Sequence, residues 1–242
     1  MLKCVRLFVT SQNFSAIMSV VTEILGDLTK LPSTLNVTHI VHQLNCLTIG
    51  TKGLARTIAE KYPWASVYAR RQRMQRRYNV ATPGTRGVPG QIVIDTAPDA
   101  PAVVGFFAQW DYGRASNHRA GRPSVYPSYC SFDDGDSNRN RIVWFKKCLE
   151  ALAVRLQDVD HPKVAFPHEI GCGLAQGNWD VYRQMIEEWS AEHQIPTLIV
   201  RWFKKPRKAV VKGISSFFKQ YAGVKKAKHR FSKIRPTPKK RR

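Results

Sequence analysis

The chain has 242 residues, of which 43% are hydrophobic and 10% aromatic, so it can form a packed core and is not disordered as a whole. Its formal net charge is +22, and no stretch approaches the apolar length that spans a bilayer. The five cysteines are odd in number and contain no CxxC pair, which argues against a disulfide framework and a zinc site. We expect an intracellular protein with no metal and no cofactor.

Apolar runs of strand length alternate with helical patterns. Strands are predicted in residues 16–25, 37–45, 90–95, 101–110, 163–166 and 197–203. Helices are predicted in residues 53–63, 136–157 and 178–194. The second helix is the clearest, with one apolar face made by Ile142, Phe145, Leu149, Leu152 and Leu156. This order predicts an α/β sandwich with a largely parallel sheet.

Four polar or glycine-bearing stretches follow these strands: GDL (26–28), HQLNC…GTKGLA (42–55), FAQWDYG (107–113) and IGCGLAQG (170–177). Because parallel strands end at one edge of the sheet, we expect all four stretches at the same edge, where ligands bind. Residues 111–136 are rich in Gly, Ser, Asn and Pro and predict a long loop, either functional or disordered.

The last of these stretches contains Gly171, Gly173 and Gly177 between a strand and a helix. Such a turn can bring backbone N–H groups against a phosphate, whereas the alternative is a plain strand-to-helix connection. GCGLAQG fits the dinucleotide-binding fingerprint poorly, because its last glycine comes one residue late and it lies near the end of the domain. Neither GK[ST] nor GxSxG occurs in the chain, so a P-loop and a serine nucleophile elbow are not expected.

Two histidines stand on one expected strand. His39 and His42 are three residues apart, so on a regular strand they point to opposite faces and cannot share a metal. His42 lies close to Asn45 and the glycine-bearing loop, which leaves a structural and a catalytic role both open.

VHQLNC, GTKGLARTIAEKYP, FAQWDYG and VAFPHEIGCGLAQGNWD, in this order, resemble the macrodomain family. The resemblance is greatest to the phage, viral and fungal branch of ADP-ribose 1″-phosphate phosphatases, which borders the terminal ADP-ribose glycohydrolases. It implies a three-layer α/β/α macrodomain in residues 18–203, after an N-terminal segment (1–17) and before a basic, partly amphipathic tail (204–242). It also implies a viral protein in the nucleus or cytoplasm of a host cell.

Carried over by position, the resemblance implies that Asp27 accepts from the adenine amino group, beside the backbone N–H of Leu28. Asn45 would bind the distal ribose, and Gly53 would approach that ribose and the phosphates. The turn formed by Gly171, Cys172, Gly173 and Leu174 would hold the diphosphate. His42 would act as an acid or base, and Asn45 would position the attacking water.

The chain departs from the family at several positions. Thr51 stands where the first loop of the family usually has a second glycine, so this loop would either be stiffer or bring Lys52 to the phosphates as an added cation. Ala175 replaces the aspartate of the glycohydrolase branch, and the lysine position of that branch falls near Ala108 or Gln109, so its covalent mechanism is not expected. Cys172 is expected to contribute its backbone rather than a nucleophilic thiol.

The implied function is hydrolysis of ADP-ribose 1″-phosphate or of protein-linked mono-ADP-ribose. The alternative is a non-catalytic ADP-ribose reader, tethered to nucleic acid by its tail.

Two segments are strongly basic. One contains Arg70, Arg71, Arg73, Arg76 and Arg77, which predict either a solvated helix face or a contact for nucleic acid or an ADP-ribose polymer. The other is the tail, with 16 Lys and Arg and no acid, whereas residues 1–203 carry the remaining 23 against 17 acids, or +6.

The tail allows three hypotheses. Its two basic clusters resemble nuclear-import signals: Lys204, Lys205, Arg207 and Lys208, and then Lys239, Lys240, Arg241 and Arg242. An amphipathic stretch between them could instead lie on an anionic membrane. We favour nucleic acid, because the cations outnumber the apolar side chains and continue to residue 242. The oligomeric state is left open.

Overall fold

The computed structural model describes residues 21–77, 79–115 and 135–202. The chain divides into two units, residues 1–203 and 204–242, and every described residue belongs to the first. The N-terminal segment and both basic clusters of the tail lie outside the described residues, so the predictions made for them stay predictions.

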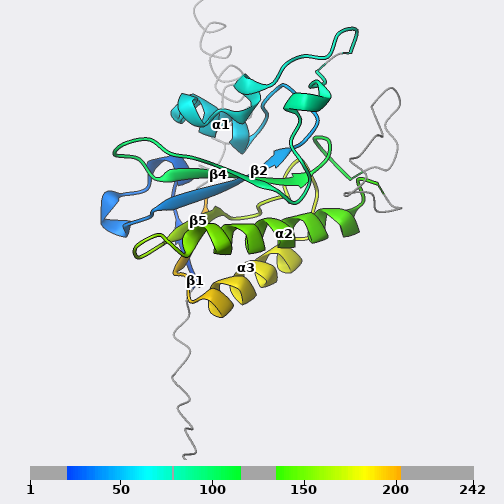
Figure 1. The fold of residues 1–242 in the computed structure, drawn as a ribbon. Coiled ribbons are helices and arrows are strands. Elements are labelled where there is room, and N and C mark those ends of the chain that lie inside the picture. Colours follow the sequence, from blue (N-terminus) through cyan, green and yellow to red (C-terminus); the bar gives the residue numbers. More distant parts are fainter. Residues whose placement is uncertain (1–20, 78, 116–134, 203–242) are drawn as a thin grey trace, which may run out of the picture. The chain divides into compact units, whose positions relative to one another are not determined.

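A six-stranded sheet forms the centre of the fold, in the order β1-β6-β5-β2-β4-β3 (Figure 1). Its strands are β1 (Val21–Leu25), β2 (His39–Asn45), β3 (Ile92–Asp95), β4 (Ala102–Gln109), β5 (Val164–Pro167) and β6 (Thr197–Arg201). Every neighbouring pair is parallel except β3 and β4, which are antiparallel. The predicted α/β sandwich with a largely parallel sheet is confirmed.

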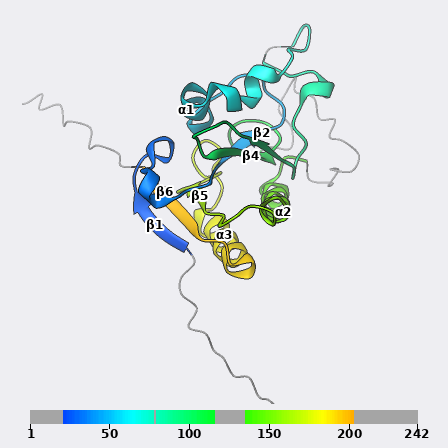
Figure 2. The ribbon, with the colours of Figure 1, turned by 60° about the vertical axis from the view of Figure 1, so that its left-hand side comes forward.

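Helices cover both faces of this sheet. α1 (Leu54–Lys61) lies over one face, and α2 (Asn138–Leu156) and α3 (Trp179–His193) lie over the other, which makes three layers (Figures 1 and 2). Short 3₁₀ helices connect these elements: η1 (Leu28–Lys30), η2 (Ser33–Leu35), η3 (Pro63–Ala65), η4 (Val67–Arg70) and η5 (Pro83–Thr85). Among the described residues, no helix is both long and apolar enough to cross a membrane.

The local sequence explains where α2 begins and which face it buries. Ser137 caps the helix by accepting a hydrogen bond from the Asn140 N–H at 3.1 Å. Its predicted apolar face packs in the core, with Phe145, Leu149, Leu152 and Leu156 buried and Ile142 partly buried. Seven of the eight β4 residues are buried as well, which fits a strand covered on both sides.

The arginine cluster does not form one solvated helix face, and that expectation is wrong. η4 ends at Arg70, which forms a two-pronged ion pair with Asp95 (Nη1–Oδ1 2.6 Å, Nη2–Oδ2 2.8 Å). Arg71 is buried instead of solvated. The other four members, Arg70, Arg73, Arg76 and Arg77, are exposed, and of these Arg70 is paired with Asp95. A contact of this cluster with nucleic acid or an ADP-ribose polymer stays a prediction.

Candidate functional site

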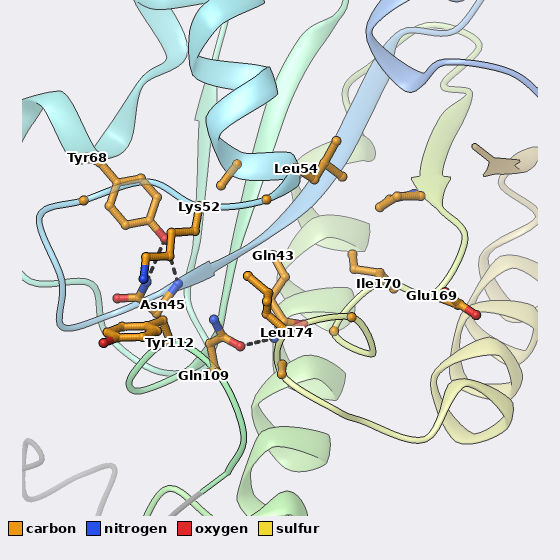
Figure 3. Close-up of a pocket in the computed structure, with 18 of the residues that line it drawn as sticks. Gln43, Asn45, Lys52, Leu54, Tyr68, Gln109, Tyr112, Glu169, Ile170 and Leu174 are labelled. Carbon is orange, nitrogen blue, oxygen red and sulfur yellow. Dashed lines mark hydrogen bonds between the residues drawn. The ribbon is translucent and has the colours of Figure 1, made fainter. Parts of the chain in front are cut away.

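A cavity of about 310 Å³ lies at the carboxyl ends of β2, β4 and β5. Three of the four predicted stretches line it: 42–55 through Gln43, Asn45 and the loop to α1, 107–113 through Gln109 and Tyr112, and 170–177 through Ile170, Gly171, Gly173, Leu174 and Ala175. Figure 3 shows these side chains converging from separate elements. The stretches that follow three parallel strands therefore meet at one edge of the sheet.

Polar side chains gather at one end of the cavity, around Asn45 (Figure 3). The Asn45 Oδ1 atom accepts from the Thr48 N–H at 2.8 Å and from the Thr48 hydroxyl at 2.9 Å. Its Nδ2 donates to the Tyr68 hydroxyl at 3.0 Å. The Lys52 ammonium lies 4.5 Å from the centre of the Tyr112 ring, a cation–π distance. This end combines a rigidly held amide with a cation.

The other end of the cavity is formed by the residues that follow β5. Pro167, His168 and Ile170 line it, and Leu54 approaches from the start of α1. The His168 ring packs against Trp179, with ring centroids 4.8 Å apart. In Figure 3, Ile170 and Glu169 lie well away from the Asn45 end. The cavity is therefore elongated, with a polar end and a second, apolar end where Pro167 and Ile170 lie beside His168 and Glu169.

The N-terminus of α1 opens onto the cavity. Gly53 is its N-cap, with a φ of 56° and no side chain to cap the helix. Leu54 and Ala55 also line the cavity, and no hydrogen bond of their N–H groups is found within the described residues. A helix start with unpaired N–H groups is suited to binding an anion.

The second glycine-bearing turn faces this helix start. An ideal Cβ on Gly53 would lie 3.7 Å from the Leu174 Cδ1 atom, so the two turns meet across the cavity. Within the described residues no carbonyl accepts from the N–H of Gly173, Leu174 or Ala175. Donors from two turns therefore stand free beside one cavity.

The glycines of the second turn are not equivalent. Gly171 has a φ of 72°, and a Cβ there would lie 2.6 Å from the Gln43 Oε1 atom. A Cβ on Gly173 would meet nothing within 4 Å. Gly171 is thus required both by its backbone conformation and by a close contact, whereas Gly173 leaves space beside the cavity.

Replacing Gly171 by Ala should lower the free energy of unfolding by about 2 kcal/mol or more, because a left-handed backbone is strained for Ala and the added methyl overlaps Gln43. Gly173→Ala is the matched control and should change it by less than about 0.5 kcal/mol. Urea denaturation of both variants tests this. Equal stabilities would contradict the role given to Gly171.

Several predicted ligand-binding residues line the cavity, namely Asn45, Gly53, Gly171, Gly173 and Leu174. Cys172 does not line it; its thiol donates to the Ile170 carbonyl at 3.2 Å. Burial raises the pKa of this thiol to about 12, and the neighbouring Glu169 and Asp180 raise it too. A thiol held in its neutral form is a poor nucleophile, which fits the expectation that Cys172 offers only its backbone.

The predicted adenine-binding residues lie outside the cavity lining. Asp27 caps η1, accepting from the Thr29 N–H at 2.9 Å and the Thr29 hydroxyl at 2.7 Å, and Leu28 is buried in the core. η1 packs against β5 and α1, the two elements that border the apolar end of the cavity. The contact of Asp27 with adenine stays a prediction.

His42 is buried inside the sheet and does not line the cavity. Within the described residues neither of its ring nitrogens has a hydrogen-bond partner. Burial lowers the pKa of His42 to about 4, although Asp95 acts in the opposite direction. The imidazole is therefore neutral at pH 7, and its catalytic role stays a prediction.

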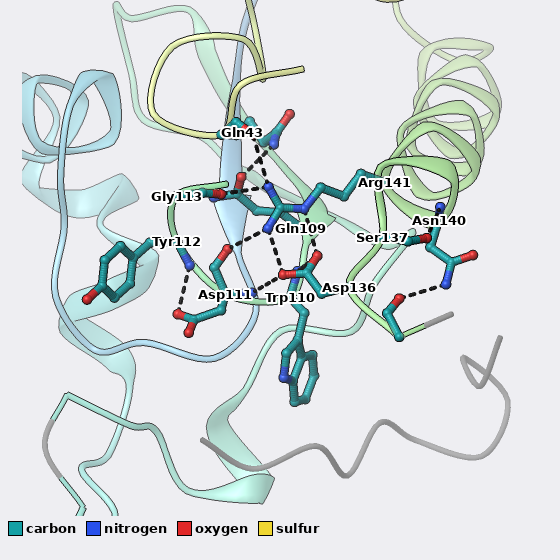
Figure 4. A network of polar contacts seen from close by, with 12 residues as sticks. Gln43, Gln109, Trp110, Asp111, Tyr112, Gly113, Asp136, Ser137, Asn140 and Arg141 are labelled. Carbon is teal, nitrogen blue, oxygen red and sulfur yellow. Dashed lines mark hydrogen bonds and ion pairs between the residues drawn. The ribbon is translucent and has the colours of Figure 1, made fainter. Parts of the chain in front are cut away.

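A buried ion pair, which the sequence patterns do not single out, holds the loops around the cavity (Figure 4). Arg141 Nε and Nη2 donate to the two carboxylate oxygens of Asp136, each at 2.6 Å. Both side chains are almost fully buried. Asp136 also accepts from the backbone N–H groups of Trp110 at 3.4 Å and Asp111 at 3.2 Å.

The same guanidinium reaches two further loops. Its Nη1 donates to the Gly113 carbonyl at 2.7 Å and more distantly to the Ala175 carbonyl at 3.5 Å, and its Nη2 donates to the Asp111 carbonyl at 3.2 Å. Gly113 and Ala175 both line the cavity. Arg141 therefore joins the loop after β4 to the turn after β5, and neither residue type nor spacing along the chain could have revealed this.

Tyr68, which lines the cavity, and Arg71, which does not, are also missed by the sequence patterns. Tyr68 lines the polar end, and Arg71 lies behind it, donating to the carbonyl oxygens of Asn45 and Thr48. In the sequence Arg71 reads as one of five clustered surface cations. Nothing short of its burial distinguishes it from its neighbours.

Fold and site together define an α/β/α sandwich protein with an elongated cavity at the carboxyl ends of its parallel strands. No family model and no curated protein matches the chain. Macrodomains are among the solved structures to which it is similar. That of Thermus aquaticus DarG is 17% identical, with 76% of this chain and 98% of that one covered and a TM-score of 0.46.

Two further macrodomains are similar to the chain at 13% identity. The Trypanosoma brucei macrodomain in complex with ADP-ribose has a TM-score of 0.45, with 87% of this chain and 71% of that one covered. A mutant Oceanobacillus iheyensis macrodomain with ADPR has the same TM-score, with 83% and 94% covered.

Proposed function

We propose that the chain binds ADP-ribose in this cavity and hydrolyses ADP-ribose 1″-phosphate or protein-linked mono-ADP-ribose. The observation that carries the proposal is the pair of glycine-bearing turns that meet across the cavity with unpaired N–H groups. Two anion-binding backbone segments on opposite sides of an elongated cavity suit a diphosphate flanked by two larger groups.

The different chemistry of the two ends of the cavity suggests how ADP-ribose would be oriented in it. The apolar end beside Pro167 and Ile170 suits the adenine, and the polar end beside Asn45 suits the distal ribose. Because Thr48 and Tyr68 hold the Asn45 amide in place, it can orient a ribose hydroxyl or an attacking water without first losing side-chain freedom.

A non-catalytic ADP-ribose reader is the second candidate. One observation favours it: His42, the acid or base that the resemblance implies, is buried off the cavity. Binding needs only the glycine turns and the adenine contact, whereas hydrolysis also needs a group that can move a proton at the ligand. The tail that would tether a reader to nucleic acid lies outside the described residues.

Calorimetry with ADP-ribose tests binding, and release assays on both substrates, run side by side, test turnover. Asp27→Ala should weaken ADP-ribose binding by about 1–3 kcal/mol if the carboxylate bonds the adenine. Asp158→Ala, an exposed acid at the end of α2, is the control and should change nothing. If ADP-ribose binds but neither substrate is hydrolysed, the non-catalytic reader is the remaining candidate. Absence of binding would rule out both candidates.

A further inference from the structure

The hydroxyl of Tyr68 lies at the polar end of the cavity and is surrounded by donors. Tyr68 is 6% exposed, and its oxygen accepts from both the backbone N–H and the side-chain Nδ2 of Asn45, each at 3.0 Å. A phenol oxygen has two lone pairs and one proton. Both lone pairs of the Tyr68 oxygen accept hydrogen bonds, so only the hydroxyl proton still needs a partner.

The Asn45 amide cannot accept this proton. Its oxygen must face the Thr48 N–H, because that backbone group can only donate. The Nδ2 group therefore faces Tyr68 as a donor. Within the described residues no acceptor lies in reach of the Tyr68 proton, and the residue lines the cavity. A buried donor without a partner is costly, so this one is expected to find its acceptor in the cavity.

Two cations, Arg71 and Lys52, lie at this end of the cavity. The Arg71 guanidinium is only 8% exposed and lies 4.5 Å from the centre of the Tyr68 ring. Within the described part of the chain no carboxylate pairs with Arg71, and its Nε lacks any partner. Lys52, the second cation, lies over the Tyr112 ring. A cation buried without a counter-ion destabilises the fold unless a negative group approaches it.

We propose that the polar end of the cavity is a subsite for an anionic group of the phosphate class, to which the Tyr68 hydroxyl and the Lys52 ammonium donate hydrogen bonds. Arg71 positions Tyr68 and supplies the favourable field without touching the ligand. The identity of the rest of the ligand rests on the proposed function, whereas the anion subsite itself does not.

Inorganic phosphate is the probe, titrated into the full chain while backbone amide NMR signals of residues 50–55 are followed. These signals report on the cavity, so phosphate bound elsewhere on this basic chain does not confuse the result. Saturable shifts are expected, and Tyr68→Phe and Lys52→Met should each raise the phosphate Kd by about tenfold, since each removes a hydrogen bond to a charged group.

Arg73→Gln, an exposed cation of the same basic segment, should leave this Kd unchanged. If phosphate binds only at the glycine turns, Tyr68→Phe will leave this Kd unchanged, whatever Lys52→Met does in the neighbouring loop, and the proposal is wrong. Lack of saturable shifts would overturn it too. Because Tyr68→Phe also removes the acceptor of the Asn45 N–H, agreement with Lys52→Met is required.

A competing titration with ADP-ribose separates this proposal from the proposed function. Tyr68-dependent phosphate binding, with no shift of the amide signals of residues 50–55 on addition of ADP-ribose, would keep the anion subsite and contradict the proposed function. ADP-ribose binding without a Tyr68-dependent phosphate site would support the proposed binding of ADP-ribose and overturn the anion subsite.

Discussion

Replacing Arg141 by Met should lower the free energy of unfolding by about 3–5 kcal/mol, because it leaves the buried carboxylate of Asp136 without its counter-ion. Arg141 and Asp136 are each 2% exposed, so water cannot replace the lost partner. Three backbone carbonyls also lose a donor in this variant. Chemical denaturation at pH 7 measures the difference from the wild type.

Lys146→Met is the matched control, since Lys146 is an exposed cation on the same helix. It should change the stability by less than about 0.5 kcal/mol. The double variant Asp136→Leu with Arg141→Met should lose less stability than the two single losses added together, because it leaves no buried charge. A small loss in Arg141→Met, or additive losses in the double variant, would contradict the proposed energetics.

The substitution Arg141→Met should also weaken the binding of a ligand in the cavity. Arg141 joins the carbonyls of Gly113 and Ala175, which line the cavity on either side. Without this link the two loops are free to separate, so ordering them again opposes binding. The loss of affinity should therefore appear even at temperatures where the variant remains folded.

Stability should fall as the pH is lowered from about 6.5 to about 4, and His42 should account for about 3 kcal/mol of that fall. Burial lowers the pKa of His42 from 6.5 to about 4 in the folded protein. Above pH 6.5 the imidazole is neutral in both states. Between these values the unfolded chain binds a proton that the folded one does not, so acid favours unfolding.

His42→Leu should remove this part of the pH dependence. At pH 7 it should not destabilise the protein strongly, since it removes two buried nitrogens that have no partner within the described residues. The exposed His161 provides the control, and His161→Leu should keep the wild-type dependence. Unfolding curves at several pH values between 4 and 7 give the comparison. If wild type and His42→Leu follow the same curve, His42 is not the buried neutral group described here.

Local patterns were sufficient for most of the fold. Strands and helices alternate as predicted because periodicity and capping act within a few residues, as in α2, with its Ser137 cap and single apolar face. The edge of the sheet at which the cavity forms was predictable as well, because parallel strands must end together. The basic segment at residues 70–77 was misjudged, since composition does not report which cation is buried.

The sequence by itself determined the order of the elements, the parallel sheet and the glycine turns that face the cavity. Only the tertiary structure decided that Arg71 and Arg141 are buried, that Tyr68 directs a hydroxyl to the polar end, and that His42 lies off the cavity. Their partners stand far away in the sequence, as Asn45 does from Tyr68 by 23 residues and Gly113 from Arg141 by 28. Hydrogen bonds and desolvation depend on which groups the packed chain brings together, and no local pattern contains that information.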